Sequence, residues 1–164
     1  ANLYGWIQRS RSFLAENGIW RATAPVELNR RELARLGMEG TYLIIYGYLP
    51  VMLTANCIQK SGTGCSRAEG LLFLEDRQKK KFPVKNCCRY CYNIIYNCAP
   101  LDLISLADEV ESLDPAGLRI DLTLETKEEA ERILKRCYRT FVLGEKDLPP
   151  EGEYTRGHFK RGVK

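Results

Sequence analysis

The sequence predicts an α/β protein with a mostly parallel β-sheet. Segments with strand and helix patterns alternate along the chain, as they do where helices connect parallel strands. Residues 41–49, T-Y-L-I-I-Y-G-Y-L, are β-branched and aromatic with little alternation, which is typical of a strand buried on both faces. Residues 127–141 follow Thr126, a good N-cap, and begin with Glu128 and Glu129, which favours a helix there.

The first third of the chain is expected to contain a helix followed by a strand–helix unit. Residues 6–16 have apolar positions at helical spacing, and Asn17 and Gly18 supply a C-terminal stop. A short strand is expected over residues 20–24. Residues 30–37 then read as a second helix, which ends on a glycine.

The later elements continue the alternation. Residues 94–97 are expected to form a short strand and residues 101–113 an amphipathic helix closed by D-P-A-G. Residues 118–124, L-R-I-D-L-T-L, alternate as a strand does. Residues 57–91 contain glycines, a D-R-Q-K-K-K turn and F-P-V-K, so they are predicted to be an insertion of loops with a hairpin.

Composition narrows the class of protein. The 164 residues are 45% hydrophobic and 28% charged, so residues 1–164 are expected to form one soluble domain with one core. A net charge of +4 permits a polyanionic partner but does not identify one. The cysteine count is odd, and the sequence shows no apolar leader and no run that could span a bilayer. A reducing cytoplasm is therefore the expected location.

Four cysteines give the strongest functional indication. Cys57, Cys65, Cys88 and Cys91 fall within 35 residues, and the last two form C-R-Y-C before an asparagine-punctuated aromatic stretch. Thiolates from two short loops are the ligands that a soft metal or an iron–sulfur cluster prefers. The sequence therefore predicts that these cysteines organise the insertion around a metal or cluster.

Two other uses of these cysteines stay open at this point. Structural zinc is favoured by C-x2-C, which is half of a zinc knuckle, but seven residues separate Cys57 from Cys65 where two to four are usual. Disulfides are disfavoured by the odd total, by the adjacent pair Cys87 and Cys88, and by the expected compartment.

Beyond these patterns, several strings together resemble one family. They are E-L-N-R-R-E-L, Y-G-Y-L-P-V-M-L-T-A-N-C, F-P-V-K-N-C-C-R-Y-C-Y-N-I-I-Y-N, L-R-I-D-L-T-L-E-T and T-R-G-H-F-K-R-G-V. In this order, over residues 20–163, the chain resembles the C-terminal half of the collagenase-like peptidase family U-thirty-two.

The resemblance implies a fold and a cofactor. The fold would be a partial (β/α) barrel of the triosephosphate isomerase (TIM) type, limited to its later strands, with a cysteine-rich insertion. The cofactor would be a four-iron, four-sulfur cluster on Cys57, Cys65, Cys88 and Cys91. Some branches of the family space the second pair by three residues, so Cys87 with Cys91 is an alternative. A partial barrel leaves a sheet edge, which a missing N-terminal half, a dimer or a partner protein would cover.

The remaining cysteines, Cys98 and Cys137, are expected to be buried apolar thiols.

The resemblance also suggests an activity. The family name implies an endopeptidase, but the sequence has one histidine, His158, and no H-E-x-x-H motif. Better-understood relatives hydroxylate RNA bases or the ubiquinone ring without oxygen, with prephenate implicated as the hydroxyl source. An iron–sulfur hydroxylase is therefore favoured over a peptidase and over a non-catalytic zinc or cluster module.

Candidate substrate-side residues follow the predicted strands. Reactive groups of parallel barrels lie at the C-terminal ends of the strands, where Glu27, Asn29, Tyr46, Tyr48 and Glu125 are expected. The alternative for the two glutamates is that they cap helices or pair with arginines.

The last residues are a second source of candidates. Residues 145–164 look like an extended basic tail in which His158 and Arg161 are substrate-side candidates and Phe159 could stack on a base. The alternative is a solvated terminus.

Overall fold

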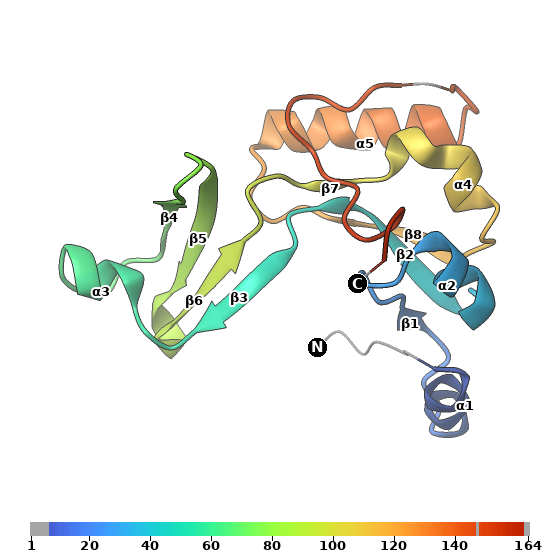
Figure 1. Ribbon diagram of the computed structural model, residues 1–164, viewed down its shortest axis with the longest axis horizontal. Helices are drawn as coiled ribbons and strands as arrows, with labels where there is room; N and C mark the ends of the chain where they lie inside the picture. Colours follow the sequence, from blue (N-terminus) through green and yellow to red (C-terminus); the bar gives the residue numbers. More distant parts are fainter. Residues whose placement is uncertain (1–6, 147, 163–164) are drawn as a thin grey trace. The chain divides into compact units, whose positions relative to one another are not determined.

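A computed structural model describes residues 7–146 and 148–162 and has a mixed α/β fold with two β-sheets (Figure 1). The chain divides into two compact units, each described here by itself. Unit 1 comprises residues 1–47 and 101–164, and unit 2 comprises Tyr48–Pro100. Unit 2 is thus wider than the insertion expected over residues 57–91.

The sheet of unit 1 is centred on strand β2. This strand runs parallel to β1 and β8 and antiparallel to the short β7. The expected α/β class is confirmed, and the sheet of unit 1 is mostly parallel, but the sheet of unit 2 is antiparallel and the described strands form no closed barrel. The strands are β1 (Ala22–Thr23), β2 (Thr41–Gly47), β7 (Leu101–Asp102) and β8 (Gly117–Asp121).

Strand β2 is buried along almost its whole length, as its continuous apolar run predicts. It ends at Gly47, two residues earlier than expected. Gly47 has a φ of 147°, and a Cβ there would lie 2.6 Å from the carbonyl oxygen of Asp121. Only glycine therefore fits where the chain leaves the sheet.

The helices of unit 1 begin at side-chain caps where the sequence supplies them. The Asn29 side chain accepts hydrogen bonds from the backbone of Arg31 and Glu32, and Glu32 accepts one from Asn29 N. Thr126 and Glu129 cap the longest helix in the same way. The helices are α1 (Gln8–Glu16), α2 (Arg30–Leu36), α4 (Ala107–Glu111) and α5 (Lys127–Phe141).

Other predicted boundaries in unit 1 also differ from the observed ones. The helix expected over residues 101–113 begins only at the 3-10 turn η2 (Ile104–Leu106), because Leu101–Asp102 pair with β2 as strand β7. The strand expected over residues 118–124 ends at Asp121. In both cases a long-range pairing decides the boundary.

Residues 155–162 pack against the rest of unit 1. Thr155 forms a parallel bridge to Leu101, and Phe159 O accepts a hydrogen bond from Arg30 N at 2.8 Å. The Phe159 ring is 3% exposed and lies among residues that include Leu33 and Leu43. Phe159 is therefore a core residue, which corrects both its expected stacking role and the solvated-terminus alternative.

A buried ion pair connects three segments of unit 1. Arg136 of α5 pairs with Asp102 of β7, and the two side chains are 10% and 3% exposed. Arg136 also donates to Pro149 O at 3.1 Å, and Arg156 donates to Asp102 O at 2.6 Å. Asp102 accepts a further bond from Ile104 N at 3.1 Å. These bonds join α5, β7 and the C-terminal segment.

Unit 2 is a four-stranded antiparallel sheet in the order β3-β6-β5-β4. The sequence predicted a hairpin here but not the full sheet. The expected strand over residues 94–97 is found two residues earlier. The elements are β3 (Pro50–Thr54), α3 (Ile58–Gly62), β4 (Gly70–Glu75), β5 (Lys81–Cys87), η1 (Cys88–Tyr90) and β6 (Tyr92–Tyr96).

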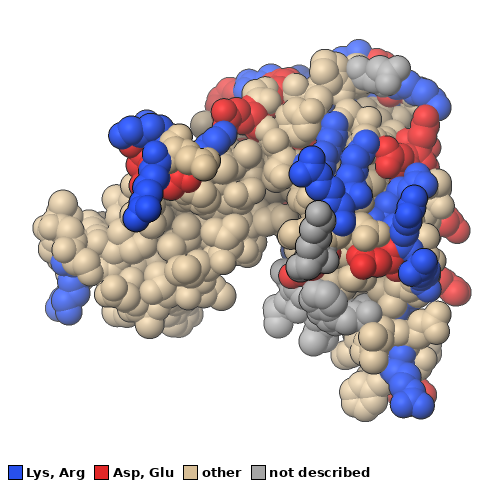
Figure 2. All heavy atoms as spheres, in the orientation of Figure 1, with Lys and Arg blue, Asp and Glu red and all other residues tan. Residues whose placement is uncertain are grey.

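The tip of the β4–β5 hairpin is a tight polar turn. The Asp76 carboxylate accepts backbone hydrogen bonds from Gln78 at 2.8 Å and Lys80 at 2.9 Å, and Lys79 has a φ of 65°. Lysine and arginine side chains gather at this tip (Figure 2). The lysines here are exposed, as expected of a solvated turn.

No helix in the described ranges is both long and apolar enough to cross a membrane.

Candidate functional site

Buried asparagines hold the segment after Cys57 against the sheet of unit 2. Asn86 and Asn93 face each other on β5 and β6, each 2% exposed, and Asn93 Nδ2 donates to Asn86 Oδ1 at 2.7 Å. Asn93 Oδ1 accepts from Ile58 N at 3.0 Å, and Asn86 Nδ2 donates to Gln59 Oε1 at 3.1 Å. This network fixes the first turn of α3, directly after Cys57.

The sequence offered a partial signal for this network. Asparagine is depleted in strands, so Asn93 within Y-N-I-I-Y-N indicates a polar role. Its partners Asn86 and Gln59 lie 7 and 34 residues away and could not be assigned by local patterns.

Replacement of Asn93 by alanine is expected to destabilise unit 2. The change leaves Ile58 N without its acceptor and Asn86 Oδ1 without its donor, and a buried unsatisfied group costs about 1–3 kcal/mol. Urea unfolding followed by circular dichroism measures the change. Asn56→Ala, at an exposed position next to Cys57, is the control, and equal stability of the two variants would contradict the role of the network.

The four candidate ligands come from three segments of unit 2. Cys57 is the N-cap of α3, with its sulfur 3.4 Å from Lys60 N. Cys65 lies exposed in the loop that follows α3. Cys88 begins the turn η1 and donates to Ala68 O at 3.1 Å. Cys91 ends the same turn in a left-handed conformation, with a φ of 52°.

The charges of three of these cysteines act on the fourth, Cys88. Desolvation raises the pKa of the Cys88 thiol above its ordinary value, and the charges of Cys57, Cys65, Glu69 and Cys91 raise it further. The fold thus brings the four cysteines to one end of the unit 2 sheet. In the part of the chain that the structure describes, no three His, Cys, Asp or Glu side chains are arranged to hold a metal ion. The four thiols thus share one end of the sheet but do not form a preformed metal site.

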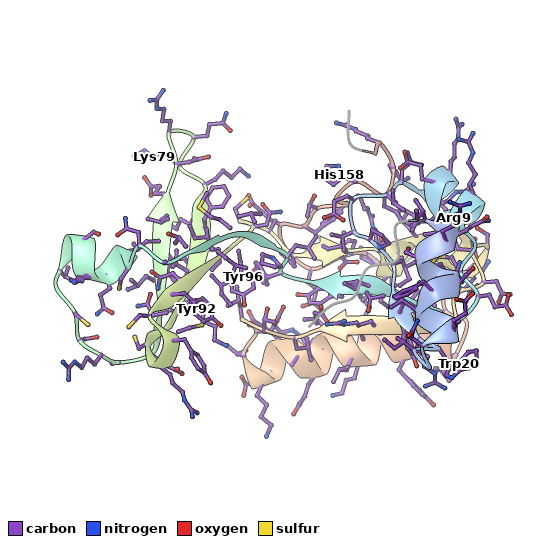
Figure 3. The ribbon with its side chains drawn as sticks, turned by 90° about the horizontal axis from the view of Figure 1, so that it is seen from below. Arg9, Trp20, Lys79, Tyr92, Tyr96 and His158 are labelled. Carbon is purple, nitrogen blue, oxygen red and sulfur yellow. The ribbon has the colours of Figure 1, made fainter. Side chains whose placement is uncertain are left out.

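The adjacent cysteines Cys87 and Cys88 have different neighbours. Cys87 is paired with Tyr92 across β5 and β6 (Figure 3 labels Tyr92). The pKa of the Tyr92 hydroxyl is raised, mainly by a hydrogen bond with the Cys87 side chain. The charge of Cys87 and desolvation raise it further. Cys87 ends β5 beside Tyr92, whereas Cys88 begins the turn η1 that Cys91 ends, which favours Cys88 over Cys87 as the ligand.

The other two cysteines stand apart from this set. Cys98 and Cys137 are each half-buried, so the expectation of fully buried thiols holds only in part. Burial raises the pKa of the Cys137 thiol on α5, partly offset by the charge of Arg136. All seven cysteines, which all lie in described residues, are free thiols.

A second group of candidates lies where β1 ends in unit 1. Arg30 N donates to Phe159 O, and a Cβ on Gly162 would lie 2.6 Å from the Asn29 side chain. The loop carrying Glu27 therefore adjoins the turn carrying His158 and Arg161. Sequence positions more than 125 residues apart are brought together here.

The individual candidates of this group differ in what they contact. Glu27 Oε2 is buried and has no hydrogen-bond partner among the described atoms. His158 is exposed, and its Nδ1 lies 3.1 Å from Gly162 O, which leaves Nε2 for another partner. Arg161 is exposed. Asn29 caps α2, which is the structural alternative to a substrate role.

The remaining three candidates are Glu125, Tyr46 and Tyr48. Glu125 Oε2 accepts hydrogen bonds from Thr123 N and Leu124 N at 2.7 and 3.0 Å, while its Oε1 is buried without a partner in the described ranges. Tyr46 is 7% exposed and belongs to the core of unit 1. Tyr48 lies in unit 2.

Comparisons of the chain with protein-family models, with curated proteins and with solved structures gave no match. The resemblance to family U-thirty-two therefore stays an expectation, and the functional argument rests on the residues of this chain.

Proposed function

We propose that this chain is the cluster-holding part of an oxygen-independent hydroxylase of family U-thirty-two, acting on RNA bases or on a quinone-type ring. The observation that carries the proposal is that Cys57, Cys65, Cys88 and Cys91 all lie at one end of the unit 2 sheet, where β3 and β5 end and β4 and β6 begin. Packing alone does not require four thiols at one end of a small sheet.

The donor set suits the proposed cofactor. Four thiolates are the usual ligands of a four-iron, four-sulfur cluster, and Cys57, Cys65, Cys88 and Cys91 would hold it. The cluster would supply one-electron redox chemistry. All four residues lie in caps, turns or loops, which can close further without breaking the sheet. Zinc suits the same donors and is the alternative occupant.

Unit 1 holds a second set of candidate substrate-side residues. Its parallel strands β1, β2 and β8, with α2 and α5, support the proposal that it is part of a TIM-type barrel. Glu27 follows β1, at the end where such barrels place reactive groups. Its unpaired oxygen would accept a proton or a hydrogen bond from the substrate, while His158 and Arg161 would bind anionic groups such as phosphate or the carboxylates of prephenate.

The peptidase alternative has less support. A serine or cysteine peptidase needs a base hydrogen-bonded to its nucleophile. In the described ranges, the polar contact of the His158 ring is with the backbone carbonyl of Gly162 and not with a nucleophilic side chain.

The first test is the metal content of anaerobically purified protein. We expect a brown protein with about four irons and four sulfides per chain. Deleting the gene should remove one added oxygen from an RNA base or a quinone, detected by mass spectrometry. A colourless protein with stoichiometric zinc, or peptide cleavage that survives cluster removal, would contradict the proposal.

A further inference from the structure

An exposed aromatic ring stands between the two cysteines of C-R-Y-C. Tyr90 is 69% exposed although it lies in the ordered turn η1. Its ring stacks on that of Tyr92, with centroids 6.4 Å apart and planes at 29°. The guanidinium of Arg89 lies 5.5 Å from the Tyr90 centroid. The Tyr90 ring is therefore exposed to solvent, contacts Tyr92 and has the Arg89 cation beside it.

The charge of the chain is concentrated in the same unit. Unit 2 has eight lysines and arginines against three acidic residues, a formal charge of +5. Unit 1 has 17 against 18, a formal charge of −1. All eight cations of unit 2 are exposed, and those at the hairpin tip are visible in Figure 2. The modest net charge of the whole chain hides a strongly basic unit.

These two features together select one kind of ligand. A cationic surface attracts phosphates, and an exposed ring beside an arginine offers a stacking surface for a base, as in proteins that bind single strands. A neutral quinone ring would use the tyrosine but gain nothing from the charge. A single exposed aromatic residue is ordinary on its own, but its combination with Arg89, the charge of unit 2 and the cysteine site is not.

We propose that Tyr90 stacks on a base of single-stranded RNA, with Arg89 beside it. The turn that carries Cys88 and Cys91 would then also bind the substrate base, which places that base next to the cysteine site. The inference rests on the proposed function and chooses RNA over quinone as its substrate.

Binding of RNA to the 164-residue chain tests this directly. The probe is a fluorescein-labelled single-stranded oligoadenylate of roughly 12 nucleotides, a common site size, and the readout is fluorescence anisotropy. Tyr90→Ala is expected to weaken binding about 5- to 150-fold, the range for losing one base stack. Tyr90→Phe keeps the ring and is expected to bind within about twofold of the unchanged chain.

Controls separate stacking from other effects. Tyr138→Ala, at a 54% exposed tyrosine of α5 in unit 1, is expected to leave RNA binding unchanged. Arg89→Ala should weaken binding and also reduce its dependence on salt, because one cation is lost.

The inference is overturned if the unchanged chain does not bind the RNA, if Tyr90→Ala binds as tightly as the unchanged chain, or if a soluble quinone binds in a Tyr90-dependent way and RNA does not. Iron and sulfide content, measured on the same preparations, distinguishes this failure from failure of the proposed function. If Tyr90 does not stack on RNA, the protein can still contain iron and sulfide. If the protein contains no cluster, RNA binding can still be measured.

Discussion

Cys88→Ser is expected to lose nearly all bound iron, whereas Cys87→Ser is expected to keep it. Serine oxygen is a poor ligand for a soft metal site. Cys88 lies within reach of Cys57, Cys65 and Cys91, while the Cys87 thiol is engaged by Tyr92. Iron and sulfide analysis after anaerobic purification measures the difference between these neighbouring positions.

Two further variants complete this experiment. Cys98→Ser and Cys137→Ser remove thiols that stand apart from the set and should retain iron, which excludes a general effect of losing a cysteine. Loss of iron in Cys87→Ser with retention in Cys88→Ser would instead make Cys87 and Cys91 the second ligand pair.

Breaking the buried ion pair of unit 1 is expected to have the largest effect on stability. Asp102→Ala leaves Arg136 charged and almost fully buried, and Arg136→Ala does the same to Asp102. Removing one partner of such a pair costs about 3–5 kcal/mol. Urea unfolding of each variant measures the loss of unfolding free energy.

The same helix offers a matched control. Arg132 lies one turn before Arg136 on α5 and pairs with Glu151 at 3.0 Å, but both side chains are more than half exposed. Arg132→Ala is expected to change the unfolding free energy far less, because exposed ion pairs contribute little. The double change Asp102→Leu with Arg136→Met should regain stability over either single alanine variant. Equal losses for Arg132→Ala and Arg136→Ala would show that burial does not set the contribution of the pair.

Local signals in the sequence were enough for the elements that local interactions decide. Thr126 as the N-cap, followed by Glu128 and Glu129, predicted the start of α5, and the apolar run predicted β2. Features that depend on contacts between distant segments could not be predicted from the sequence. Nothing near Phe159 indicates that its ring fills a space beside Leu33 and Leu43.

The proline in F-P-V-K is one reason why the sequence predicts loops with a hairpin, and not a four-stranded sheet, in unit 2. Proline lacks an N–H group and is excluded from the middle of a sheet. Pro83 nevertheless lies in β5, paired with Phe73 of β4, because pairing with β6 starts only at Val84. The proline therefore occupies a position where β5 has one partner strand, which sequence alone does not reveal.

The candidate site divides in the same way. Cysteine spacing pointed to four thiols that the fold places at one end of the unit 2 sheet, but their role as ligands stays a prediction. The different surroundings of Cys87 and Cys88 depend on where β5 ends and the turn η1 begins. The buried, unpaired oxygen of Glu27 depends on atoms from several segments.

The division of the chain into two units has a consequence for synthesis on the ribosome. Unit 2 is one continuous stretch, Tyr48–Pro100, whereas β2 needs β7 and β8, which are made later. Domains tend to fold as they emerge, beginning with those made first. The cysteine unit can therefore finish folding, with its four candidate ligands in place, while the protein that surrounds it in sequence is still being translated.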